Sequence, residues 1–177
     1  MNFSFYLAIP FLVITLVVNG QVLFEETDDQ FVKQIENTYQ KGVDFLAKTQ
    51  NGQGSWDDST YGSNPGVVGM SILAFLARGD DPEFGTYRTS ITKALTFLLK
   101  LQDKKTGYIG SSMYNHGFAT LALAEIYGKT NIQGIGPALE KATRLIISSQ
   151  KNNPKGAWRY SPESNDADIT VSGAQML

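Results

Sequence analysis

Cysteine is absent from the 177-residue sequence, and histidine occurs once, at position 116. The absence of cysteine excludes disulfides, Cys-ligated zinc and thiolate nucleophiles. The charge is nearly balanced, because 15 basic residues face 17 acidic ones and the formal net charge is −2. Such a balance provides no electrostatic attraction to nucleic acid, so we expect no nucleic-acid partner. We also expect no metal ion and no other cofactor.

The sequence also lacks a hydrophobic run of the roughly 20 residues that a membrane-spanning helix needs. The uncharged apolar run over residues 5–18 is shorter, and it is followed by Val18, Asn19 and Gly20. This pattern predicts a secretory signal peptide over residues 1–20, although the amino-terminal region has no Lys or Arg. A retained membrane anchor and a buried helix are the alternatives. A signal peptide or a retained anchor would place the protein in the periplasm, outside the cell, or on the outer side of a membrane.

One pattern occurs three times, at residues 41–56, 93–108 and 141–158. Each copy reads as the end of an amphipathic helix, then Gln, then a Gly-containing turn that closes with an aromatic residue. The Lys and Gln of each copy keep the same separation, in the pairs Lys41/Gln50, Lys93/Gln102 and Lys141/Gln150. The copies lie about 50 residues apart, and a fixed period of this size indicates a repeat architecture.

The hydrophobic spacing predicts two kinds of helix. Amphipathic helices are expected over residues 28–49, 87–101 and 138–149, the first with a capping box from Thr27 to Gln30. Helices that are apolar on nearly every side are expected over 66–77 and 116–127, and a third begins near Asp168. Together they predict an all-α protein with three repeats, about 28–80, 86–130 and 136–177. The apolar helices should lie inside.

The repeated pattern resembles the QW motif of the terpenoid cyclase and protein prenyltransferase superfamily. The first and third copies match it throughout, whereas the second ends in Tyr108 instead of Trp. The resemblance implies an α/α toroid over residues 21–177, incomplete in this chain, with further carboxy-terminal repeats of the same protein as its partner. It also implies that the motif residues tie the outer helices together and are not catalytic. These residues are Gln50, Trp56, Gln102, Tyr108, Gln150 and Trp158.

The segment from Asp166 to Thr170 resembles the acid motif of squalene-hopene cyclases, with Ile169 in place of its third acidic residue. The resemblance implies that Asp168 is a general acid, and that Asp166 and His116 support it. Alternatively, Asp168 is the N-cap of a helix, a position where Asp is favoured. For His116 the alternative is a capping or packing role.

Three functions remain open from the sequence. The first is a non-catalytic exported toroid that binds a protein partner or an apolar, isoprenoid-like ligand. The second is a class II terpene cyclase, in which aromatic residues such as Tyr61, Tyr114 and Tyr160 line a cavity and stabilise cations. The third is a carbohydrate-active (α/α) barrel that uses carboxylates in the loops. These carboxylates are Asp57, Asp58, Glu163, Asp166 and Asp168.

Overall fold

The computed structural model describes residues 29–57, 60 and 62–177. Over these residues it contains helices and no strand, which confirms the all-α prediction. The helices are α1 (Asp29–Thr49), α2 (Pro65–Ala77), α3 (Arg88–Leu101), α4 (Met113–Ile126), α5 (Ile135–Asn152) and α6 (Ile169–Met176). The chain divides into two units, residues 1–36 and 37–177. The described part of the first unit is the start of α1, and all packing below concerns the second.

Each predicted helix is present, and the differences lie at the ends. α4 begins at Met113 because the Ser112 side chain caps it, with Asn115 N–H donating to Ser112 Oγ at 3.3 Å. α5 begins at Ile135, so Pro137 lies within its first turn, where a missing N–H costs nothing. The predicted signal peptide and the capping residues Thr27 and Asp28 lie outside the described residues.

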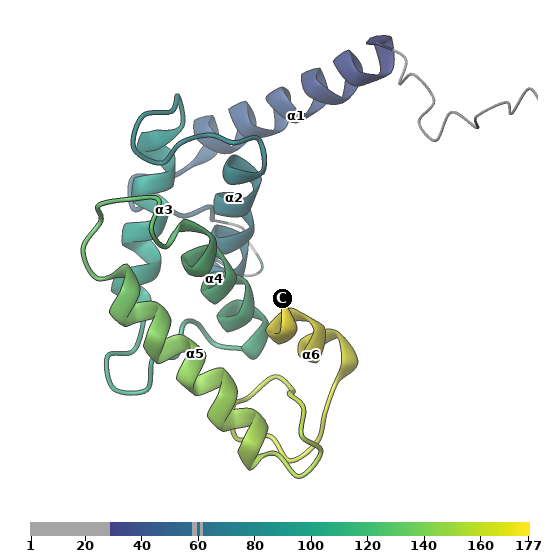
Figure 1. The fold of residues 1–177 in the computed structure, drawn as a ribbon, viewed down its shortest axis with the longest axis vertical. Coiled ribbons are helices and arrows are strands. Elements are labelled where there is room, and N and C mark those ends of the chain that lie inside the picture. The colour runs from purple at the N-terminus through teal and green to yellow at the C-terminus, as the bar shows by residue number, and fades with distance from the viewer. Residues whose placement is uncertain (1–28, 58–59, 61) are drawn as a thin grey trace, which may run out of the picture. The chain divides into compact units, whose positions relative to one another are not determined.

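The apolar helices pack in succession, α2 against α4 and α4 against α6, while α3 packs on α2 and α5 on α4 (Figure 1). Glycines allow the close approach. A Cβ built on Gly69 of α2 would lie 2.5 Å from the Phe118 carbonyl oxygen of α4. A Cβ on Gly117 of α4 would lie 2.4 Å from the Ala174 carbonyl oxygen of α6. The main chains therefore touch at both crossings.

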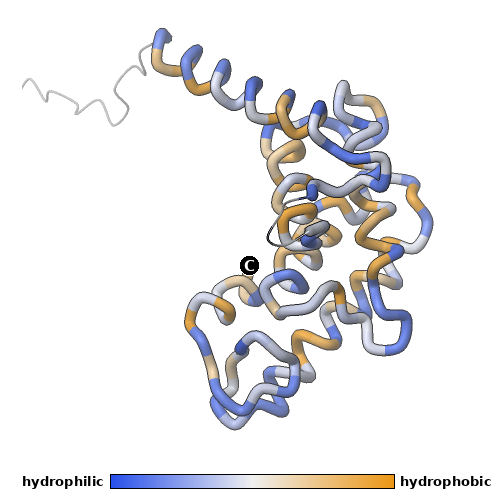
Figure 2. The backbone as a smooth tube through the Cα atoms, turned by 180° about the vertical axis from the view of Figure 1, so that it is seen from behind, coloured by the Kyte–Doolittle hydropathy of each residue, from blue (hydrophilic) through white to orange (hydrophobic). Residues whose placement is uncertain are grey.

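The outer helices are amphipathic, and Figure 2 shows polar and apolar residues alternating along the turns of α1. In α3 the residues Ile91, Ala94, Leu95 and Leu98 are fully buried. The expectation that the apolar helices lie inside is met by only part of α2, because Val68, Ile72 and Phe75 are fully buried and two other side chains are exposed. Val67 is 38% exposed and Met70 is 46% exposed. Within the part of the chain that the structure describes, no helix has the length and apolarity to cross a membrane.

Candidate functional site

The first two of the repeated Gln side chains join their loop to the next outer helix, whereas Gln150 Nε2 donates to Gly156 O of its own loop at 3.0 Å. Gln50 Nε2 donates to Gly54 O in its own loop at 3.2 Å and to Ser90 O in α3 at 2.9 Å. Gln102 is buried, and its Nε2 donates to Gly107 O at 3.0 Å and to Ala138 O in α5 at 2.8 Å. These amides bridge successive repeats through main-chain acceptors, so their role in the structure is architectural.

The aromatic residues that close the loops pack back onto their own repeat. The indole N–H of Trp56 donates to Leu46 O at 2.9 Å, and that of Trp158 donates to Ile146 O at the same distance. Tyr108 takes this place in the second repeat, and its ring packs on the His116 ring with centroids 5.4 Å apart. Burial raises the pKa of Tyr108 to about 12.

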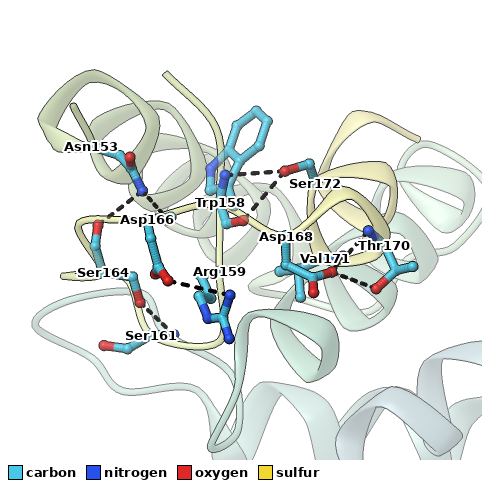
Figure 3. Close-up of polar contacts among 10 residues, drawn as sticks. All are labelled: Asn153, Trp158, Arg159, Ser161, Ser164, Asp166, Asp168, Thr170, Val171 and Ser172. Carbon is cyan, nitrogen blue, oxygen red and sulfur yellow. Dashed lines mark hydrogen bonds and ion pairs between the residues drawn. The ribbon is translucent and has the colours of Figure 1, made fainter. Parts of the chain in front are cut away.

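Asp168 is the N-cap of α6 (Figure 3). Its Oδ1 accepts from Thr170 N–H at 2.9 Å, Val171 N–H at 3.0 Å and the Thr170 hydroxyl at 2.5 Å. These bonds, the Thr170 hydroxyl first, lower the pKa of Asp168 below its ordinary value. A general acid must hold its proton, and a lowered pKa favours the carboxylate. The arrangement thus supports the capping role, and the catalytic assignment of Asp168 stays a prediction.

Asp166 lies in the loop before α6 and forms an ion pair with Arg159, with 3.3 Å between Arg159 Nη1 and Asp166 Oδ2 (Figure 3). Its main-chain oxygen accepts from Asn153 Nδ2 at 2.8 Å, and Ser164 O accepts from the same nitrogen at 2.8 Å. Both side chains of the ion pair are partly exposed, so we expect the pair to add little stability. Asp166 therefore helps to hold the loop that positions Asp168.

His116 is fully buried in α4. Its Nδ1 accepts from Ile109 N–H at 3.2 Å, so the proton of the neutral ring sits on Nε2, which lies 3.1 Å from Ala142 O in α5. Burial lowers the pKa of His116 to about 4. Both ring nitrogens are bonded to main chain of neighbouring segments. The structure gives His116 a packing role between the second and third repeats.

Tyr114, rather than His116, connects to Asp168. The Tyr114 hydroxyl contacts the Thr170 hydroxyl, which in turn donates to Asp168. The ring of Tyr114 pairs with that of Tyr160 at 6.0 Å between centroids, and the Arg159 guanidinium lies 5.3 Å from the Tyr160 ring centroid. The sequence placed Tyr114 and Tyr160 among possible lining residues. The bond to Thr170 was missed, since nothing in the sequence links residues 56 positions apart.

The remaining candidate residues lie in separate loops. Asp57, in the first loop, accepts from the Ser63 hydroxyl and from Asn51 Nδ2, and these bonds lower its pKa. Glu163, in the third loop, accepts from the Ser161 hydroxyl at 2.5 Å. Asp58 and Tyr61 lie outside the described residues. Over the described residues no group of three or more acidic or histidine side chains is placed to hold a metal ion.

Two of the described apolar helices, α2 and α6, expose large apolar side chains. α2 exposes Val67 and Met70, and α6 exposes Ile169 (88%) and Met176 (78%). Tyr114 of α4 is partly exposed. Such side chains on otherwise buried helices are available for an apolar ligand or another protein surface.

No protein family, no curated protein and no solved structure matches the chain in comparisons of its sequence and fold.

Proposed function

We propose that this protein is a non-catalytic, exported repeat scaffold of the terpenoid cyclase and prenyltransferase type, which binds an apolar, isoprenoid-like ligand or a protein partner. The supporting observation is the apolar surface on its inner helices, above all Val67 and Met70 of α2. Exposed apolar side chains on these helices cost solubility, and a ligand that covers them would recover hydrophobic free energy.

The hydrogen bonds of Asp168 and His116 support binding over catalysis. Asp168 uses its carboxylate to cap α6, and its hydrogen bonds favour the ionised form. His116 is buried and bonded on both ring nitrogens to main chain. Protonating an alkene requires a neutral carboxylic acid in a site that stabilises cations. The described arrangement supplies neither the proton nor a histidine that contacts Asp168.

Binding is tested with the fluorescent apolar probe 1-anilinonaphthalene-8-sulfonate and with its displacement by squalene. Met70→Lys should weaken probe binding at least about fivefold, because a charge replaces apolar surface on α2. Phe84→Lys is the matched control, since Phe84 is 88% exposed but lies in the loop between α2 and α3. Equal binding by the two variants would contradict the assignment to the inner helices.

Absence of catalysis is tested by incubating the protein with squalene and following products by mass spectrometry. We expect no cyclised product from the native chain or from Asp168→Asn. A cyclised product that disappears in Asp168→Asn would overturn the non-catalytic assignment and establish a cyclase with Asp168 as its acid.

A carbohydrate ligand is the second candidate, because of the exposed group around Tyr160. This group combines the paired rings of Tyr114 and Tyr160 with Arg159 and Asp166. Affinity electrophoresis in acidic and neutral polysaccharides tests it. Retardation that Tyr160→Ala removes would favour this candidate over the apolar ligand.

A further inference from the structure

A groove of about 520 Å³ lies where the loop after α1 meets α3, at the junction of the first two repeats. Gly52 and Gln53 of the loop line one side of it, and residues 92–101 of α3 line the other. The loop and the helix meet main chain to main chain, because a Cβ built on Gly54 would lie 2.3 Å from the Lys93 carbonyl oxygen. The groove is therefore formed by two segments in the middle of the chain that are held firmly together.

The groove combines apolar side chains with two cations. Phe97 is half-buried and Leu101 is 42% exposed, and both line the groove. Lys93 and Lys100 are exposed and line it as well. The two lysines are seven residues apart, which is two helical turns or about 10 Å, and Phe97 lies between them along α3. None of the described residues that line the groove is acidic.

The groove lies on the side of α3 that faces away from the inner helices. The residues of α3 that are fully buried in the core are Ile91, Ala94, Leu95 and Leu98. At the helical period, Lys93, Phe97 and Lys100 fall on a different side of the helix. The groove is therefore separate from the apolar surface of α2.

The junction of the second and third repeats engages its cations within the chain. Lys141 corresponds to Lys93, and its Nζ donates to the Lys104 carbonyl oxygen at 2.8 Å. Arg144 corresponds to Thr96 and forms an ion pair with Glu140 at 2.7 Å. Among the described residues, neither Lys93 nor Lys100 forms an ion pair. The first junction thus keeps two cations beside an open apolar groove, and the second does not.

We propose that this groove binds an acidic peptide segment of a partner protein, in which two carboxylates flank an apolar side chain. In an extended segment Glu-x-Phe-x-Glu, all three named side chains point to the same face. Their carboxylates would pair with Lys93 and Lys100, whose long stems adapt to the spacing, and the aromatic ring would lie against Phe97. An acidic segment is favoured over an uncharged one because both cations lack an ion-pair partner within the described chain. The inference does not depend on whether the inner helices bind an apolar ligand.

The test is fluorescence anisotropy of a rhodamine-labelled peptide, Glu-Ser-Phe-Ser-Glu, titrated with the full chain at low ionic strength. We expect Lys100→Glu to weaken binding at least about tenfold, because it reverses one of the two paired charges. Lys151→Glu is the matched control, since Lys151 is also exposed in the last turn of an outer helix but lies away from the groove. It changes the net charge equally and should alter the affinity by less than about twofold.

Two further variants separate shape from charge and this groove from the inner helices. Thr96→Trp fills the groove without changing any charge, and it should abolish binding of the peptide. Met70→Lys, on α2, should leave peptide binding unchanged. Thermal unfolding followed by circular dichroism checks that each variant is folded.

Three results would overturn the proposal. The first is no binding of the peptide by the folded native protein up to about 1 mM. The second is an equal loss in Lys100→Glu and Lys151→Glu, or equal binding of the uncharged peptide Gln-Ser-Phe-Ser-Gln. The third is sedimentation with phosphatidylglycerol vesicles that Lys100→Glu abolishes, without peptide binding, which would assign the groove to an anionic lipid surface instead.

Discussion

The loops after α3 and α5 carry the same Gln and Gly, yet their surroundings differ. Gln102 and Gly107 are buried under the first turns of α5, whereas Gln150 is half-buried and Gly156 is exposed. Both loops nevertheless close on themselves, since Gln102 reaches Gly107 O and Gln150 reaches Gly156 O at 3.0 Å. The comparison shows that each loop conformation is stabilised within its own repeat. The hydrogen bond to the next outer helix is a separate, additional contact. Nearest-neighbour coupling of this kind is the energetic pattern of repeat proteins.

Substitution of the loop glycines should give the largest difference in stability between the first and third loops. Gly54→Ala should lower the free energy of unfolding by about 3 kcal/mol or more, because the new methyl overlaps the Lys93 main chain and φ is positive. Gly156→Ala meets open space and should cost about 1 kcal/mol from its backbone conformation alone. Urea unfolding at low protein concentration measures both. Equal losses would show that the two loops are not distinguished by a docked helix.

His116 provides a pH-dependent test of the packing between the second and third repeats. Its pKa in the folded state is about 4 and its ordinary value is 6.5, so the unfolded chain binds the proton more tightly. The stability from neutral His116 is therefore complete above pH 6.5 and declines as the pH falls toward 4. We expect a loss of about 2 kcal/mol by pH 5 and about 3 kcal/mol by pH 4.

The pH series is measured by urea unfolding of the native protein and of His116→Gln. The glutamine amide can donate and accept but does not titrate, so its stability should be flat between pH 7 and 5. The same slope in both proteins would assign the pH dependence to other groups.

The repeated Gln side chains should differ by less. Gln102→Leu removes two hydrogen bonds at a buried site and should cost about 2 kcal/mol. Gln150→Leu removes one bond at a partly exposed site and should cost about 0.5 kcal/mol. Thermal unfolding of the two variants side by side gives the ratio. If Gln150→Leu lost as much stability as Gln102→Leu, Gln150 would have a further hydrogen-bond partner in solution.

The tryptophans should show no contrast, because their hydrogen bonds lie within one repeat. Trp56→Phe and Trp158→Phe each remove an indole donor to a carbonyl at 2.9 Å. Each should cost about 1 kcal/mol in urea unfolding. A clearly larger loss at Trp56 would show that its bond also depends on the neighbouring helix.

The sequence predicted the helices because their signals are local. The spacing of apolar residues predicted α1, α3 and α5. The sequence allowed two interpretations of Asp168, a general acid or an N-cap, and in the structure Asp168 is the N-cap of α6. The environment of His116 was not predictable, because its partners Ile109 and Ala142 are set by packing between repeats. The contact of Tyr114 with Thr170 depends on the crossing of α4 and α6, which a single sequence does not encode locally.

The acceptors at the two junctions, Ser90 and Ala138, have different side chains but offer the same carbonyl group. The opposing contact is a glycine main chain against a lysine main chain. Because the glutamine bonds to a main-chain carbonyl, the side chains at Ser90 and Ala138 can change by mutation while the hydrogen bond between the repeats is kept. The repeats can therefore diverge in sequence while each keeps a loop glutamine that bonds to a glycine carbonyl of its own loop.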